Sequence, residues 1–404
     1  MERNVVGIDV GTTKVCTLVG DVSEEGVLRI MGVGVVPSRG LRKGMVVDVN
    51  EATDVIATSV ERAERFSGYH IESAYVAIAG GHISSVNSRG VVAVSRDSIA
   101  QSDVDRALEA AQAIAIDHNR QIIHVIPRGF VLDGQDGVRN PIGMRGFRLE
   151  VEAHIVTGAI ASIHNLAKCV QGAGVEVQDL VLAPLASSEA VLTTTEREMG
   201  VVLADIGGGT TDIAIFVEGS IWHSSVLPIG GNHLTNDVAV GLRTPFTNAE
   251  DIKIRCGYAI PDHIPPDETV DFTAFGEGLR QSVSRRYLSE ILEARAEEIF
   301  NLILQEVQRS GYDGLLPAGV VLSGGVANLA GFKDLGREVL KLPVRVGAPH
   351  GLEGLVDIIT SPAYATGVGL LLWGMKHAEA APPSPPEDPI SRFIRWLRKA
   401  FFPG

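Results

Sequence analysis

Cysteine is scarce in this chain of 404 residues, and the three that occur, Cys16, Cys169 and Cys256, lie far apart in the sequence. No C-x-x-C pair and no cluster of cysteine with histidine is present. The sequence therefore excludes a disulfide framework and a zinc site of the usual spacing. The expected environment is a reducing cytoplasm.

Long apolar runs are also missing. No window of about 18 apolar residues occurs, so we expect no helix that spans a membrane. The most apolar stretch, GVGLLLW at 367–373, is too short to span and predicts a buried helix. At the other end, MERN leads directly into VVGIDVG, which is typical of a strand and not of a signal peptide.

Positive charge is in deficit, because 35 Lys and Arg face 49 Asp and Glu, for a formal net charge of −14. A phosphate backbone requires a positive face, so nucleic acid is not an expected partner. Hydrophobic residues make up 45% of the chain and charged residues 21%, which indicates a globular protein with ample core material. The length suggests two or three domains, or one large body with two lobes.

Glycine, by contrast, is plentiful and follows apolar, β-branched segments. NVVGIDVGTTK (4–14), GVVLADIGGGTTDIAIF (200–216) and AGVVLSGGVANLAGF (318–332) each run into a glycine-rich turn. Helix-like runs at 52–66, 103–115 and 288–308 lie between the strand-like segments. This alternation predicts an α/β fold whose sheets are covered by helices. A polar, proline-rich stretch at 259–277 is expected to form a loop or an edge excursion.

The first two glycine segments share one design: strand, Asp, glycine-rich turn, strand. Either alone is equally compatible with an ordinary tight hairpin, but the pair suggests two related halves that face each other and hold a polyphosphate. We expect Asp9 and Asp205 to lie near Mg²⁺ and to hold it through water. The predicted phosphate ligands come from both turns: Gly11, Thr12, Thr13, Lys14, Gly207, Gly208, Gly209, Thr210 and Thr211.

The third glycine segment completes a nucleotide site. SGGVANLAG (323–331) would let the adenosine of ATP lie against bare backbone at the start of a helix. The residues predicted to contact adenosine are Ser323, Gly324, Gly325 and Val326. The expected cofactors are thus ATP and Mg²⁺.

Together the three segments resemble the two phosphate motifs and the adenosine motif of the actin, heat-shock chaperone and sugar-kinase superfamily. Within it, the chain resembles the bacterial cell-division family FtsA over essentially its full length, through 124–158, 182–192 and 361–374. The resemblance implies an actin-like fold of two ribonuclease-H-like lobes with an inserted subdomain and a C-terminal amphipathic helix. The implied domains are a first lobe (1–85, 159–199), the insert (86–158), a second lobe (200–241, 305–379), its small subdomain (242–304), a linker (380–389) and a terminal helix (390–404).

The resemblance also implies individual roles. Glu250 and Lys253 match positions that meet the ribose and base of ATP, although the residues by themselves favour a charged helix face at 250–255. Ala183 falls where sugar kinases and actin-like members carry a residue that orients the attacking water. Alanine cannot do so, and Asp205 remains the candidate catalytic group. We expect ATP binding with weak or no hydrolysis, which leaves open whether the protein is an enzyme.

The last residues, PISRFIRWLRKAFFPG (389–404), are basic and aromatic and follow a polyproline-like linker. At about 100° per residue one face is apolar and the other is basic. This pattern predicts an interfacial helix on anionic lipid, the alternative being a helix docked on its own domain. The predicted membrane contacts are Phe393, Ile394, Trp396, Leu397, Phe401, Arg392, Arg395, Arg398 and Lys399.

The resemblance implies an ATP-binding protein that polymerises on the cytoplasmic face of the cell membrane at the division site. There it would anchor filaments of the tubulin-like protein FtsZ and help assemble the divisome with other division proteins. The FtsZ C-terminal peptide would dock on the small subdomain, with Arg295 as the nominated contact; a solvated helix face is the alternative for Arg295. Two other functions stay open from the sequence: a pilus-assembly actin-like ATPase, or a sugar or small-molecule kinase on the same fold.

Overall fold

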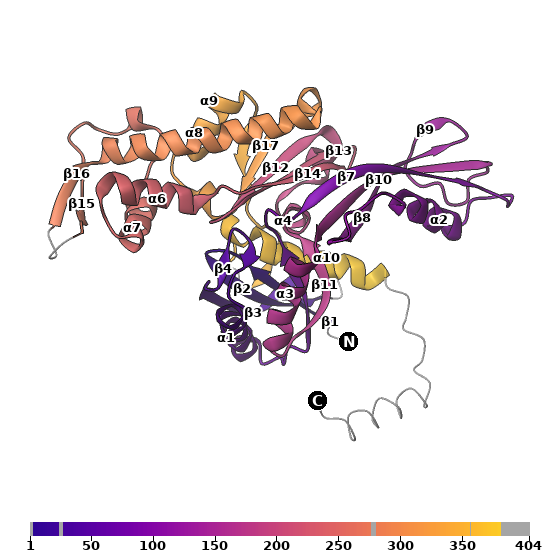
Figure 1. Cartoon of the computed structure of the whole chain (residues 1–404), viewed down its shortest axis with the longest axis horizontal. Helices are drawn as coiled ribbons and strands as arrows, with labels where there is room; N and C mark the ends of the chain where they lie inside the picture. The colour runs from indigo at the N-terminus through magenta and orange to yellow at the C-terminus, as the bar shows by residue number, and fades with distance from the viewer. Residues whose placement is uncertain (1–2, 24–26, 276–279, 356, 381–404) are drawn as a thin grey trace, which may run out of the picture.

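The computed structural model describes residues 3–23, 27–275, 280–355 and 357–380. Figure 1 shows an elongated molecule. Strands β7 to β10 with helix α2 form one end, α6, α7, β15 and β16 form the other, and the N-terminal sheet lies below the middle.

The first sheet has the strand order β11-β6-β1-β2-β3-β19. β1 pairs antiparallel with β2 and parallel with β6, which in turn pairs parallel with β11. Its strands are β1 (Arg3–Val10), β2 (Lys14–Val22), β3 (Leu28–Pro37), β6 (Ser73–Ile78), β11 (Glu176–Leu182) and β19 (Glu353–Gly354). A two-residue ladder of β4 (Leu41–Arg42) and β5 (Met45–Val46) follows β3.

The second sheet repeats this topology in the order β14-β13-β12-β17-β18. β12 pairs antiparallel with β13 and parallel with β17, as β1 does with β2 and β6. Its strands are β12 (Val201–Ile206), β13 (Thr211–Val217), β14 (Ser220–Leu227), β17 (Val320–Ser323) and β18 (Val344–Val346). The predicted duplication is thereby confirmed at the level of whole sheets.

Helices cover both faces of each sheet, and α4 (Ala183–Val191) and α10 (Ala365–Ala380) lie between the two sheets. Alternate residues of β1 show this: Val5 packs on the layer of α4 and α10, whereas Val6 packs under α1 (Val49–Ser67). α3 (Ile160–Gly172) joins α1 on the outer face of the first sheet. The core is therefore continuous through both lobes, and the middle helical layer connects them.

Local signals set the helix limits. The Asp48 side chain accepts a hydrogen bond from the Glu51 N–H at 3.0 Å and begins α1, and Gly68 ends it in the left-handed conformation at φ 68°. The three predicted helical runs are confirmed as α1, α2 (Gln101–Gln112) and α8 (Arg285–Ser310). The remaining helices of the described ranges are α5 (Thr194–Met199), α6 (Gly231–Leu242), α7 (Phe246–Cys256), α9 (Phe332–Leu340) and the 3₁₀ turns η1 (Pro261–His263), η2 (Asp313–Leu315), η3 (Gly325–Asn328) and η4 (Pro362–Tyr364).

The segment between β6 and α3 forms a separate antiparallel sheet in the order β7-β10-β8-β9, with α2 packed on β7 and β10. Its strands are β7 (Ser84–Ala93), β8 (Arg120–Leu132), β9 (Gln135–Val138) and β10 (Arg148–Ala159). Buried polar contacts join it to β14, because the two ring nitrogens of His154 bond Asn87 Oδ1 at 2.7 Å and Ser224 Oγ at 2.8 Å. The insert is thus attached to the second lobe, although the chain enters and leaves it from the first.

Two segments depart from expectation. The proline-rich stretch 259–277, expected to be a loop or edge excursion, contains η1 and the strand β15 (Thr269–Thr273), which pairs with β16 (Arg280–Ser284). Helix α10, predicted as a buried helix and placed with the second lobe, packs on β1, β2 and β6 of the first. In the part of the chain that the structure describes, no helix is long and apolar enough to cross a bilayer.

Candidate functional site

The two predicted phosphate turns meet at the bottom of a cleft between the lobes, with a volume of about 540 Å³. Each turn closes with the same backbone hydrogen bond: Gly11 N–H donates to Lys14 O at 3.0 Å, and Gly207 N–H to Thr210 O at 2.9 Å. The turns therefore leave their strands in the same way and lie against each other from opposite sheets.

The third glycine segment packs directly on the second turn. Gly324 has φ +80°, and a Cβ there would lie 2.4 Å from Ile206 O, so only glycine fits between β12 and the segment after β17. The expectation that this segment starts a helix is corrected in detail. A 3₁₀ turn, η3, forms within the segment, and α9 begins only at Phe332. Since β17 is parallel to β12, the segment emerges beside the phosphate turn without needing a helix of its own.

Three carboxylates gather at the cleft: Asp9, Asp205 and Asp212. Burial raises the pKa of Asp9 to about 6, with Lys14 lowering it and Asp205 raising it. Burial, assisted by Asp205, raises the pKa of Asp212 to about 8, and burial also raises the pKa of Asp205. The Asp212 Oδ1 atom is buried and has no hydrogen-bond partner among the described residues. Such a group of acids favours a cation at the cleft floor.

Residues 363–366 contact Lys14 and one of these acids, Asp205. The Lys14 ammonium donates to Ala363 O and lies 4.6 Å from the ring centre of Tyr364. The Thr366 hydroxyl donates to Asp205 Oδ2 at 3.1 Å. Lys14 thus stands beside Asp9, where its charge also favours a bound anion.

At the other end of the cleft, Glu250 and Lys253 of α7 line the wall together. Lys253 Nζ lies 2.6 Å from Glu250 Oε2 and 2.8 Å from Thr235 Oγ1. The two are therefore part of the cleft wall and not a free charged helix face.

Two of the predicted ligand residues lie behind the cleft instead of lining it. The hydroxyl of Thr211 donates to Ile229 O at 2.9 Å, and that of Ser323 to Pro362 O at 3.3 Å, and both residues are fully buried. Their side chains support the turns. The other predicted ligand residues line the cleft: Gly11, Thr12, Thr13, Lys14, Gly207, Gly208, Gly209, Thr210, Glu250, Lys253, Gly324, Gly325 and Val326.

Sequence reasoning left Asp212 and Thr366 unassigned. The sequence already indicates that Asp212 lies close to Asp205, and the four-residue turn between β12 and β13 makes the two residues cross-strand partners. Thr366 had no such signal, since it approaches from a helix 161 residues along the chain.

Ala183, the first residue of α4, lines the cleft at the position expected to orient water. Glu189, the nearest acid further along α4, is bound to Arg197 at 2.9 Å and to Lys376. The Glu189 carboxylate therefore forms ion pairs that connect α4 to α5 and α10.

Arg295 lies on α8 and is already paired. Its guanidinium contacts the Asp237 carboxylate at 2.5 and 3.0 Å and also contacts Glu298. A docking peptide would therefore have to share this arginine with two acids. The predicted membrane residues between 392 and 401, and the linker from 381, lie outside the described residues.

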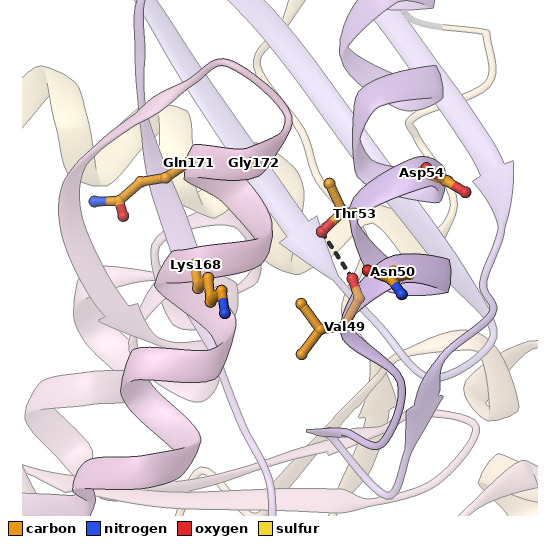
Figure 2. A pocket seen from close by; sticks show the side chains of 7 residues that line it. All are labelled: Val49, Asn50, Thr53, Asp54, Lys168, Gln171 and Gly172. Carbon is orange, nitrogen blue, oxygen red and sulfur yellow. Dashed lines mark hydrogen bonds between the residues drawn. The ribbon is translucent and has the colours of Figure 1, made fainter. Parts of the chain in front are cut away.

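A second depression lies on the first lobe between the start of α1 and the end of α3. Figure 2 shows Lys168 and Gln171 on one side and Asn50, Thr53 and Asp54 on the other, with Asp54 turned away from the gap. Its charged side chains are exposed, and Thr53 donates to Val49 O of its own helix. Nothing in this depression resembles the buried acids of the cleft.

The fold is that of actin-like proteins. The chain is similar to a structure titled "PilM-PilN type IV pilus biogenesis complex", with a TM-score of 0.67 and 15% identity, covering 92% of this chain and 98% of that one. It is also similar to MreB5 of Spiroplasma citri bound to ADP, with a TM-score of 0.57 and 15% identity over 94% and 99% of the two chains.

Sequence comparison is more specific. Residues 202–369 match the family model "Cell division protein FtsA", and residues 80–157 match "SHS2 domain inserted in FTSA". The FtsA of Pseudomonas aeruginosa is 43% identical over 99% of this chain and 98% of its own length. The FtsA of Escherichia coli K12 is 37% identical over 98% of both. The chain therefore belongs to the FtsA family of cell division proteins.

Proposed function

We propose that the protein is an ATP-binding, actin-like cell division protein that polymerises on the cytoplasmic membrane and anchors FtsZ filaments to it. The observation that carries the proposal is the identity of 37–43% to cell division FtsA proteins over nearly the whole chain. The likeness to the pilus protein, at 15% identity, concerns the fold alone, and so it does not favour the pilus-assembly alternative.

ATP fits the cleft as follows. The N–H groups of the two turns and the Lys14 ammonium would face the phosphates, while Glu250 and Lys253 lie where the ribose would extend. Val326 and the bare backbone of Gly324 and Gly325 line the wall between these ends. MreB5, on a related fold, binds ADP.

Mg²⁺ would lie near Asp9 and Asp205, with Asp212 as a third acid. The raised pKa values and the unpartnered Asp212 Oδ1 support a cation there. Within the described ranges, no three His, Cys, Asp or Glu side chains form a metal-binding group by themselves. Since Mg²⁺ keeps several of its waters, it would be held there through water and phosphate oxygens.

We expect slow or no ATP hydrolysis. Ala183 occupies the position from which a polar side chain would orient water, and a methyl group can neither donate nor accept a hydrogen bond. Asp205 is the remaining candidate base. Burial raises the pKa of its carboxyl, and only the ionised form could accept a proton from water.

The membrane and FtsZ contacts are proposed from sequence and family. The basic, aromatic residues 390–404 would lie on anionic lipid at the inner face of the cell membrane at the division site, and filament formation would multiply their weak individual binding. The FtsZ C-terminal peptide would dock on residues 242–304, where Arg295 would exchange Glu298 for an acidic group of the peptide. Other divisome proteins would join this assembly.

The test is electron microscopy of the protein on anionic lipid monolayers, with and without Mg·ATP, followed by addition of FtsZ. We expect ATP-dependent filaments that recruit FtsZ, and loss of both with Trp396→Glu. Trp396→Phe, which keeps an apolar aromatic side chain at the same position, is the matched control and should behave as the parent. Filaments that never recruit FtsZ or its C-terminal peptide would refute the anchoring role.

A further inference from the structure

One fully buried hydroxyl joins the two ends of the cleft. Thr235 lies on α6 with no exposed surface, and its Oγ1 accepts a hydrogen bond from Lys253 Nζ at 2.8 Å. The same oxygen contacts Glu250 Oε2 and lies 3.0 Å from Gly231 O. Three residues of two helices therefore meet at a single side-chain oxygen.

The hydroxyl has one proton, so it can donate to only one of its two acceptors. A carboxylate is the stronger acceptor, which favours donation to Glu250, while the lysine donates to the free lone pair. In this arrangement Thr235 fixes the Glu250 carboxylate and the Lys253 ammonium relative to each other and to α6.

Helix α6 is in turn fixed to the phosphate turn. Gly231 N–H donates to Gly207 O at 2.9 Å, and Asn232 N–H donates to Gly208 O at 2.8 Å. A Cβ on Gly230 would lie 2.5 Å from Gly207 O, so the start of α6 touches the turn with no space between them. The turn and Thr235 thus belong to one rigid piece. α7 is attached to it through this hydroxyl, through a longer bond from Lys253 Nζ to Gly231 O at 3.4 Å and through the buried side chains of Ala249 and Ile252.

We infer that Thr235 is a positioning residue, which sets the distance between the phosphate turn Gly207–Gly209 and the Glu250–Lys253 pair on α7. It would not touch the nucleotide. Its removal would leave the phosphate end of the cleft intact and misplace the nucleoside end. This inference rests on the proposed ATP site.

The experiment measures Mg²⁺-dependent binding of ATP and of inorganic tripolyphosphate by calorimetry, for the full chain and for Thr235→Val and Thr235→Ser. Valine keeps the branched shape without the hydroxyl, and serine keeps the hydroxyl. We expect Thr235→Val to weaken ATP binding about tenfold and to leave tripolyphosphate binding within twofold of the parent. Thr235→Ser should restore ATP binding.

Other results would overturn the inference. If Thr235→Val weakens the binding of ATP and of tripolyphosphate equally, Thr235 only supports the fold of the turn. If the substitution weakens the binding of neither ligand, the hydroxyl does not position the Glu250–Lys253 pair. A serine variant as weak as the valine variant would assign the effect to packing of the methyl group. If the parent protein binds tripolyphosphate but not ATP, the proposed ATP site itself is wrong, and that result is distinct from the other three.

Discussion

The two phosphate turns have one backbone and two different sets of side chains. Asp9, Gly11 and Lys14 correspond in position to Asp205, Gly207 and Thr210, and each turn closes with the same hydrogen bond. Between these positions, the first turn has Thr12 and Thr13, whereas the second has Gly208 and Gly209. The two turns therefore share one backbone geometry and differ in the side chains that they place in the cleft.

The divergence makes the turns complementary. A Cβ added to Gly208 would lie 2.0 Å from Thr13 Oγ1, and one added to Gly209 would lie 2.7 Å from Thr12 Oγ1. The threonine side chains of one turn occupy the space that glycine leaves in the other. Two identical turns of the first kind would collide at this point, so duplication alone could not have produced the cleft.

The two turns also differ in their charged residues. The first turn has the cation, Lys14, and places Cys16 across from Asp9. The second turn has Thr210 instead and places Asp212 across from Asp205. One lysine therefore faces three carboxylates. Burial raises the pKa values of all three acids, and repulsion by Asp205 adds to the increase for Asp9 and Asp212. Four substitutions test the comparison.

Adding a side chain to the second turn should have the largest effect on ATP binding. Gly208→Val places methyl groups against Thr13, and such overpacking costs about 1–3 kcal/mol, which would weaken ATP binding roughly ten- to hundredfold. Adding Thr13→Ala should recover part of that loss. Gly129→Val, on a strand with open space beside it, is the control. Calorimetry showing equal losses with and without Thr13→Ala would contradict complementarity.

Removing the positive charge of the first turn should have the next largest effect on ATP binding. Lys14→Thr introduces the residue that the second turn has at the matching position and removes the cation beside Asp9. We expect ATP binding to weaken about tenfold, since a charge-assisted contact with phosphate is lost. Lys168→Thr, at an exposed lysine on α3, should change nothing. An unaltered affinity for Lys14→Thr would remove this lysine from the site.

The second turn should make the stability of the protein depend on pH through Asp212, since the first turn has Cys16 at the matching position. The folded pKa of Asp212, about 8, lies above the ordinary 3.8, so its contribution to stability is complete below pH 4 and is lost as pH rises to 8. Asp9, with a pKa of about 6, loses its contribution earlier. Asp212→Asn should therefore raise the Tm at pH 8 by about 2–4 °C and have less effect at pH 5.

Thermal unfolding without nucleotide or Mg²⁺ measures this difference. Asp54→Asn, at an exposed acid on α1, is the control and should follow the parent curve. If the Asp212→Asn curve runs parallel to that of the parent between pH 6 and 8, the carboxylate does not titrate as proposed.

The smallest effect is expected for the brace on Asp205. Thr366→Val removes the hydrogen bond to Asp205 Oδ2 and should weaken Mg·ATP binding about fivefold, because a single buried hydrogen bond contributes about 1 kcal/mol. Thr366→Ser keeps the hydroxyl and should match the parent. A serine variant as weak as the valine variant would show that Thr366 acts through packing.

The sequence alone determined the elements whose signals are local. Apolar strands that run into glycine identified both turns, the segment at 323–331 and the α/β class, because strand period and turn chemistry act over a few residues. The helical runs of α1, α2 and α8 and the burial of 367–373 were predicted for the same reason. Even Asp212 was within reach, since a four-residue turn fixes its partner.

Tertiary structure alone decided what joins distant segments. Nothing near position 366 or 235 in the chain indicates that a threonine there holds Asp205 or connects α6 to α7, and nothing local shows that α10 packs on the first lobe. The same holds for Arg295, which the sequence presents as an available cation and the fold pairs with Asp237, 58 residues away. Burial and pairing depend on which surfaces meet, and that is settled only when the two sheets close on the helices between them.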